Sequence, residues 1–402
     1  MGVEVALASV GMILLLGFLG ELVFRKTNVP SVLWLLALGL LLGPVFGVAN
    51  PQQFIGIVEL FAAVAIAIIV FEGGLGMDMY SMFSEAKSSV ALTLAAFFLS
   101  AVAAASVMFI AGYSVINSLL MGVVVGGTNS AIVMSGISRI AGTSKAAKAL
   151  ISLETAINDV LVIIMFIVIS QLALAGSADL LTAARTLVGQ FSIGAIIGIL
   201  VGLAWLPLYH RLARIEFSYV VTLSLLFLLY SGVELMQGNG ALAALLFGVV
   251  LGNARQVLRT FKIQKPFALD QTTRHFHSFI SFITRTFFFV YIGIIVSIKD
   301  YRALAIGGAI ALALLAARAV AVRVSTHRNR DLTPFDRSIM TIMLPRGLTA
   351  AVLAYLPASR GVAGTEAFAD IVFTVIVVTV IIYTIGMLAI ERKSKRKQAV
   401  GA

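Results

Sequence analysis

Cysteine is absent from the 402-residue sequence, and charged residues are scarce. Without cysteine the chain has no disulfide and no thiolate to offer a metal. Asp, Glu, Lys and Arg together make up 12% of the chain, whereas soluble domains contain about 25%. Because 60% of the residues are hydrophobic, the composition predicts a polytopic membrane protein, and we expect no nucleic-acid partner.

Motifs for nucleotide-driven or metal-dependent chemistry are also missing. The sequence has no Gly-x-x-x-x-Gly-Lys-Ser/Thr loop to hold a phosphate, so we expect no nucleotide to drive the protein. It also lacks the His-Glu-x-x-His motif of metalloproteases and the filter sequence of potassium channels. We therefore expect neither a cofactor nor an enzymatic activity.

Long apolar runs predict an all-α membrane protein as one transmembrane unit, 1–402. The runs have about 18 residues or more, enough to cross the bilayer as helices. They are far longer than the alternating segments of about ten residues that form a barrel. Thirteen such spans are expected, with approximate limits 3–24, 31–48, 53–71, 88–112, 115–140, 146–174, 180–206, 217–236, 240–259, 274–298, 302–323, 336–358 and 366–390.

Basic residues in the loops predict the orientation of these spans. The net charge is +11, and most Lys and Arg residues lie in the loops that follow odd-numbered spans. The positive-inside rule then places the N-terminus outside and the C-terminus in the cytoplasm of a cell (plasma) membrane. Residues 392–402 form a basic cytoplasmic tail, which we expect to interact with anionic membrane lipids.

One expected span carries polar residues at a membrane depth where polar side chains are energetically unfavourable. Glu154, Thr155, Asn158 and Asp159 lie at the start of the run 151–169, and a carboxylate at membrane depth costs at least about 2.5 kcal/mol. On a helix, Glu154 and Asn158 share one face, and Thr155 and Asp159 share another. The pattern indicates an all-oxygen cation site with one titratable member, or a structural ion pair between helices.

Two other spans contain helix-breaking stretches. In one, residues 122–131 include three glycines and then Thr128-Asn129-Ser130. In the other, Pro345-Arg346-Gly347 removes a backbone donor and tolerates a break. Because paired discontinuous helices typically mark a transporter's binding site, we expect inverted repeats with two broken helices that cross near the bilayer midplane.

Two further charges need an explanation at this depth. Arg346 requires a partner, and we expect a structural ion pair with Glu154, on the face away from Asp159. Glu72 ends the third span, where it either lines a funnel toward the site or lies at the membrane interface.

Five sequence segments together resemble the monovalent cation/proton antiporters, in the NhaP-type sodium/proton exchanger branch. The Glu-x-x-x-Asn-Asp pattern is the most specific of them. They occur in the family's order, and they are 29–44, Phe71-Glu-Gly-Gly-Leu75, Glu154-Thr-Ala-Ile-Asn-Asp159, 240–248 and Pro345-Arg-Gly347.

This resemblance implies a homodimer with a 13-helix inverted-repeat fold. A dimer domain of about 1–87 and 175–300 would support a mobile, ion-translocating core of about 88–174 and 301–391. The resemblance also implies a monovalent cation at Asp159, helped by Asn158, Thr155 and the unwound backbone around Thr128, with Glu72 close by.

The chain departs from the family pattern at one position. The family usually has Thr-Asp-Pro in the first broken span, whereas this sequence has Thr128-Asn129-Ser130. Without that carboxylate, the family pattern no longer predicts which groups around Asn129 bind the cation. It also leaves undetermined which cation is preferred and how tightly it binds.

One carboxylate that binds either a cation or a proton predicts exchange without ATP. We expect Na+ or Li+, or alternatively K+, to compete with H+ at Asp159. Exchange should be electroneutral, one for one, and proceed by alternating access. Such exchange would serve pH homeostasis. Two alternatives remain: an organic-anion or other solute symporter on the same fold, in which Arg346 serves the substrate, and a channel.

Overall fold

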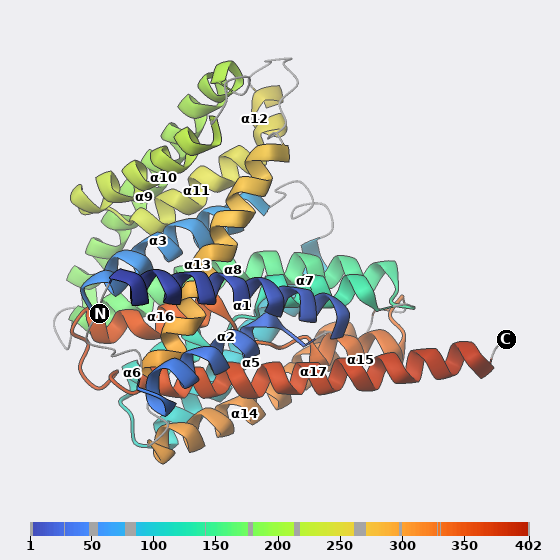
Figure 1. Ribbon diagram of the computed structural model, residues 1–402. Coiled ribbons are helices and arrows are strands. Elements are labelled where there is room, and N and C mark those ends of the chain that lie inside the picture. Colours follow the sequence, from blue (N-terminus) through green and yellow to red (C-terminus); the bar gives the residue numbers. More distant parts are fainter. Residues whose placement is uncertain are drawn as a thin grey trace. The chain divides into compact units, whose positions relative to one another are not determined.

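The computed structural model describes residues 3–400 except 28, 48–54, 77–85, 141, 176–179, 213–217, 261–270, 297–299, 328 and 330. Every secondary-structure element in the described residues is a helix. The predicted all-α fold is therefore confirmed. Figure 1 shows these helices with their labels.

The chain forms two compact units. Unit 1 comprises Met1–Val58, Lys87–Val162 and Arg285–Ala402, and unit 2 comprises Glu59–Ala86 and Ile163–Thr284. Each unit is assembled from segments that are far apart in the sequence. The expected division into dimer and core domains follows other boundaries and remains a prediction.

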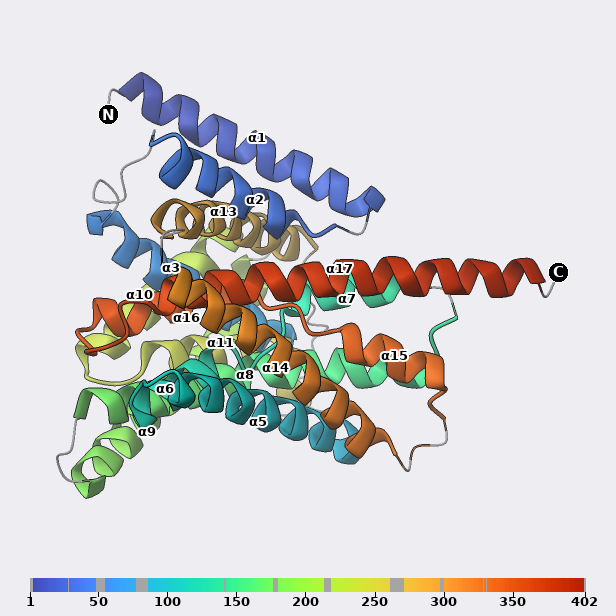
Figure 2. The ribbon, with the colours of Figure 1, turned by 90° about the horizontal axis from the view of Figure 1, so that it is seen from below.

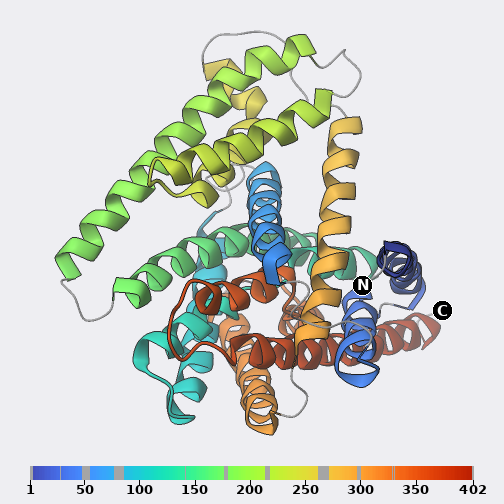
Figure 3. The same cartoon turned by 60° about the vertical axis from the view of Figure 1, so that its left-hand side comes forward.

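Unit 2 is built around α9, α10 and α11, which pack against one another and lie side by side in Figure 3. Its buried core includes the aromatic side chains of Phe71, Trp205, Tyr209 and Phe247. The rings of Phe71 and Phe247 stack with centroids 5.3 Å apart. The helices that contribute to it are α3 (Ile55–Gly76), α9 (Leu180–Leu212), α10 (Ser218–Leu235), α11 (Gly240–Gly252) and α12 (Ala254–Thr260).

Unit 1 contains both broken helices. In it α17 packs against α14, α15 and α16, and Figure 2 shows this long helix running beside them. The elements that contribute to unit 1 are α1 (Val3–Thr27), α2 (Ser31–Leu40), a π-helical turn (Leu41–Val45), α5 (Ala86–Ile110), α6 (Val115–Val124), α7 (Ser130–Arg139), α8 (Lys145–Ala175), α13 (Gln271–Ile295), α14 (Tyr301–Thr326), α15 (Pro334–Ile342), α16 (Leu348–Ser359) and α17 (Phe368–Val400).

Polar caps fix where several of these helices begin. Thr333 and Asp336 form a capping box at the start of α15, with Pro334 in the first turn. The carboxylate of Asp336 also accepts a hydrogen bond of 2.9 Å from the backbone N–H of Ser144, and the Ser144 hydroxyl caps α8 through the Ala147 N–H. One carboxylate therefore joins the starts of α8 and α15.

Apolar length supports a membrane location. Within the described ranges, four helical segments are long and apolar enough to cross a bilayer, Val90–Ile110, Val188–Tyr209, Tyr301–Thr326 and Phe368–Ile390. Several shorter apolar helices, among them α11 and α16, accompany them. The expected number of thirteen spans remains a prediction.

Candidate functional site

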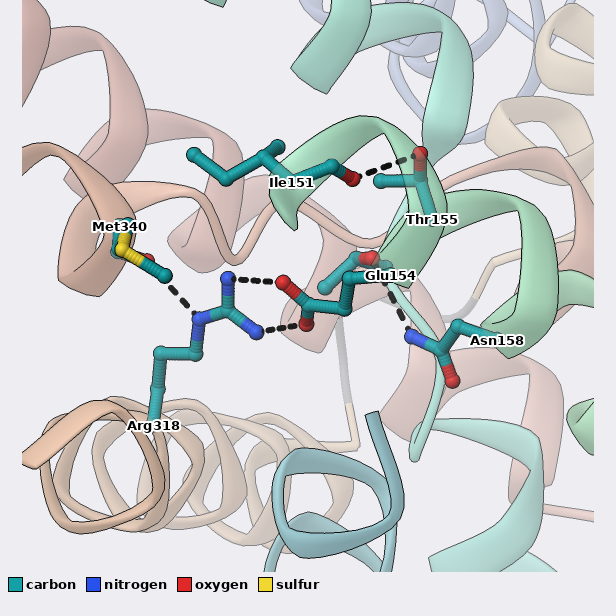
Figure 4. Close-up of polar contacts among 7 residues, drawn as sticks. Ile151, Glu154, Thr155, Asn158, Arg318 and Met340 are labelled. Carbon is teal, nitrogen blue, oxygen red and sulfur yellow. Dashed lines mark hydrogen bonds and ion pairs between the residues drawn. The ribbon is translucent and has the colours of Figure 1, made fainter. Parts of the chain in front are cut away.

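Helix α8 carries the buried polar residues predicted from the sequence. Glu154, Thr155 and Asn158 are 0%, 2% and 1% exposed. Glu154 does not stand alone, because the guanidinium of Arg318 on α14 binds both of its carboxylate oxygens. The Nη2–Oε2 distance is 2.8 Å, and Figure 4 shows the two side chains facing each other.

The expected partner of Glu154 is therefore corrected. Arg346 is 1% exposed, yet within the described part of the chain the only ion pair of Glu154 is with Arg318. The guanidinium of Arg318 donates to both oxygens of Glu154, the geometry of a strong bidentate pair. In the described residues, Nε and Nη1 of Arg346 have no hydrogen-bond partner.

Arg318 was missed by reasoning from the sequence alone. It lies within the apolar helix α14 and is 2% exposed. Its Nε donates to the backbone oxygen of Met340 at 2.9 Å, so it joins α14, α8 and the last turn of α15. A charged residue inside a long apolar run was the available signal, because such a residue requires a partner.

Both predicted helix breaks are present. Helix α6 ends at Val124 and α7 begins at Ser130, while α15 ends at Ile342 and α16 begins at Leu348. In the first break, the side-chain oxygen of Asn129 accepts from the Ile132 N–H at 3.0 Å and caps α7.

The two breaks touch each other. The Asn129 N–H donates to the Pro345 backbone oxygen at 2.7 Å. A Cβ atom on Gly347 would overlap the side-chain nitrogen of Asn129, so only glycine permits this approach. On the other side of the second break, the Arg346 N–H donates to the Thr379 hydroxyl of α17 at 3.1 Å. The pattern predicted two breaks, and the structure brings them into direct contact.

Helix α8 contacts the first break through its polar face. The side-chain nitrogen of Asn158 donates to the Thr128 hydroxyl at 3.2 Å, whereas the side-chain oxygen of Asn158 is buried and has no partner in the described residues. The Thr155 hydroxyl donates to the Ile151 backbone oxygen at 3.1 Å. The structure thus brings Asn158, Thr128 and Asn129 into one cluster.

A small pocket lies where these segments meet. Its cavity volume is about 10 Å³, room for about one water-sized molecule. Its polar side chains are those of Thr128, Asn129 and Thr349. Its full lining is Val124, Gly127, Thr128, Asn129, Val162, Gly347, Thr349 and Ala350.

For two predicted site residues, Asp159 and Glu72, the expected role is not tested by the described structure. Asp159 follows Asn158 on α8, but its side chain lies outside the described residues. Glu72 is a partly buried residue of α3, in unit 2. Its proposed role near the cation remains a prediction, as does that of Asp159.

Comparison with known proteins assigns the family. The family described as "Sodium/hydrogen exchanger, transmembrane" matches residues 11–390. The chain belongs to this family. Its members are transporters and not enzymes, which confirms two predictions, the family itself and the absence of an enzymatic role.

Several relatives carry antiporter names. The chain is 25% identical over 395 residues to the K(+)/H(+) antiporter NhaP2 of Shewanella sp. (strain MR-4), covering 93% of this chain and 64% of that protein. It is 23% identical over 405 residues to the K(+)/H(+) antiporter NhaP of Alkalimonas amylolytica, covering 94% of this chain and 65% of that protein. The chain therefore spans somewhat less than two thirds of the length of these relatives.

The fold is similar to that of a solved transporter. The sodium proton antiporter MjNhaP1 from Methanocaldococcus jannaschii matches with a TM-score of 0.73 and 21% identity, covering 96% of each chain. At this identity the likeness shows the fold alone. It supports the predicted all-helical fold class.

Proposed function

We propose that this chain exchanges a monovalent cation for H+ across the plasma membrane, as a homodimer with its C-terminus in the cytoplasm. The observation that carries the proposal is the hydrogen bond between Asn158 and Thr128. It places the residue next to Asp159 against the unwound segment of a broken helix, where free backbone and side-chain oxygens can replace a cation's hydration shell.

The charge pattern supports one titratable site. Glu154 is occupied by Arg318 on both carboxylate oxygens, so it is a structural residue and not a carrier. Asp159 is then the carboxylate on α8 for which a cation and a proton compete, with Asn158, Thr155, Thr128 and Asn129 nearby. Either occupant neutralises Asp159, and exchange proceeds without ATP.

The preferred cation remains part of the proposal. Relatives are named as K(+)/H(+) antiporters, and the similar structure as a sodium proton antiporter. We expect Na+ or Li+ first and K+ as the alternative. Asp159 is the one carboxylate of the site and Asn158 is neutral, so the site carries either one cation or one proton. One positive charge then moves in each direction, and exchange should be electroneutral.

The decisive experiment uses purified protein in sealed liposomes with an imposed pH gradient and a trapped pH dye. Na+, Li+, K+ and choline are added in turn, with Asp159→Asn as the matched variant. We expect at least one alkali cation, but not choline, to dissipate the gradient, and the variant to lose this activity. If no alkali cation moves protons through correctly folded protein, the proposal is wrong.

Symport of an organic anion is a second candidate, and one observation favours it. Arg346 is buried with two nitrogen atoms, Nε and Nη1, that donate to no described residue, and a guanidinium binds a carboxylate well. The same liposomes decide between the candidates, because a symporter would acidify or alkalinise the lumen only when a carboxylate substrate is added.

A further inference from the structure

The hydroxyl of Thr349 stands out among the threonines of the helices. In several others the hydroxyl donates to the backbone oxygen four residues earlier, a common use of this side chain. Examples are Thr155, Thr326, Thr341, Thr374, Thr379 and Thr384. Within the described residues, no hydrogen bond is made by the Thr349 side chain.

The break in the helix explains this difference. The residue four positions before Thr349 is Pro345, which lies before the start of α16 at Leu348. The Pro345 oxygen instead accepts the Asn129 N–H of the other broken helix. The Thr349 hydroxyl is thereby freed from its usual partner, and it borders the pocket at the crossing.

A second unused oxygen lies beside Gly127, one of the residues that line the pocket. The side-chain oxygen of Asn158 is fully buried without a partner in the described residues, on a residue that is 1% exposed. It lies 3.8 Å from the position that a Cβ of Gly127 would take, and Gly127 lines the pocket. A buried acceptor left unbonded costs about 1–3 kcal/mol, so it calls for an occupant.

We propose that Thr349 is a further cation-binding and specificity-determining residue, which rests on the exchange function proposed above. The pocket then binds a partly dehydrated monovalent cation through neutral oxygens, those of Thr349, Thr128 and Asn158. These groups neither gain nor lose a proton near neutral pH, so they contribute to cation binding without contributing to H+ binding. They set which cation is preferred, because size and oxygen geometry decide among Li+, Na+ and K+.

The test compares Thr349→Val, which removes the hydroxyl at nearly constant volume, with Thr349→Ser, which keeps it. Exchange is measured in liposomes over a range of Li+, Na+ and K+ concentrations. We expect Thr349→Val to raise the half-saturating concentration of the preferred cation about three- to tenfold, as the loss of one hydrogen-bond-sized contact implies. The maximal rate should stay within about twofold, and Thr349→Ser should restore the affinity.

Thr384→Val is the matched control, because the Thr384 hydroxyl is already bonded to the Val380 oxygen at 2.7 Å. It should leave the half-saturating concentrations unchanged. A merely structural Thr349 would lower the maximal rate for all cations alike, without changing their order, and would overturn the proposal.

A separate readout distinguishes this inference from the exchange function itself. The thermal unfolding temperature of each purified protein is measured with increasing Na+ or K+. If the wild type exchanges cations but Thr349→Val binds and transports them with unchanged affinity, the role of Thr349 is refuted and exchange stands. If the wild type is neither stabilised by an alkali cation nor able to exchange it, both proposals fall.

Discussion

At the scale of single residues, Glu154 and Arg318 hold the buried core of unit 1 together. Each is almost completely buried, and Arg318 also donates to the Met340 backbone oxygen. Replacing such a pair by well-packed apolar residues often costs no stability, but losing one member leaves a buried charge without its counterpart. The pair therefore acts mainly to fix how α8, α14 and α15 meet.

The first prediction follows from this pairing. Glu154→Gln or Arg318→Gln alone should destabilise the protein by about 3–5 kcal/mol, because each leaves an uncompensated buried charge. The double variant should lose clearly less than the sum of the single losses. Thermal or chemical unfolding in detergent measures these values.

The combination of Glu154→Gln with Arg302→Gln serves as the control for that cycle. Its losses should add, since Arg302 is an exposed residue about 24 Å along α14 from Arg318. Strong coupling of Glu154 with Arg302, and none with Arg318, would contradict the pairing.

The second prediction concerns Gly347, where the two breaks touch. Gly347→Ala places a methyl group on the side-chain nitrogen of Asn129, and overpacking of this kind costs about 1–3 kcal/mol. Gly308→Ala is the matched control, because nothing lies within 4 Å of its added Cβ. Unfolding temperatures compare the two variants.

Rescue makes this prediction more specific. Adding Asn129→Ala to Gly347→Ala removes the atoms that the methyl group meets. The double variant should regain part of the stability lost by Gly347→Ala. No rescue at all would show that the clash with Asn129 is not the cause.

At the scale of elements, the sequence predicted the positions of the helix breaks better than it predicted the ion-pair partner of Glu154. The glycines before Thr128 and the Pro345-Arg346-Gly347 run act on their own backbone, so both interruptions follow from local chemistry. The partner of Glu154 depends on how α8 and α14 are rotated against each other. No local rule sets that rotation, and Arg346 and Arg318 were both available in the sequence.

The site shows the same limit in another form. The sequence identified Asn158 and Thr128 as site residues, and the structure joins them by a hydrogen bond. Thr349 carries no signal in the sequence, because its place beside the pocket depends on the crossing of the two breaks, where Asn129 contacts Pro345. That contact links residues more than two hundred positions apart, so it arises from the tertiary fold.

The third prediction tests the joint between α8 and α15. Asp336 is 0% exposed and accepts from the N–H groups of Ser144 and Thr333 and from the Thr333 hydroxyl. Asp336→Ala removes all three bonds and should lower stability by about 2–4 kcal/mol, since bonds to charged groups contribute about 1.5–3 kcal/mol each but are not additive. Asp331→Ala, on an exposed residue, should have little effect on the same unfolding measurement.

At the scale of the whole molecule, the absence of cysteine allows a direct test of orientation. The fourth prediction uses single cysteines introduced near either end of the chain, as Gly2→Cys or Ala402→Cys. In intact cells, a membrane-impermeant maleimide should label only the variant with an external N-terminal cysteine. The C-terminal variant should react after lysis, because the basic tail is expected inside.

The unchanged chain is the control for this labelling, since it has no thiol. Labelling of the C-terminal cysteine in intact cells would reverse the orientation. Equal labelling of both variants would mean an even number of spans. Either result would contradict the expected topology.

The contact between the two breaks also has a consequence for motion. Residues 125–129 and 343–347 lie outside the helices, so they can change their backbone angles without opening a hydrogen-bonded ladder. The helices on either side are held by such ladders and open only slowly in lipid. Conformational freedom in this unit is thus concentrated at one small region, where the joint of Asn129 and Pro345 makes the two segments shift together. The fastest deuterium uptake among its buried amides should therefore occur in these two segments, at amides other than those of Asn129 and Arg346, which are hydrogen-bonded.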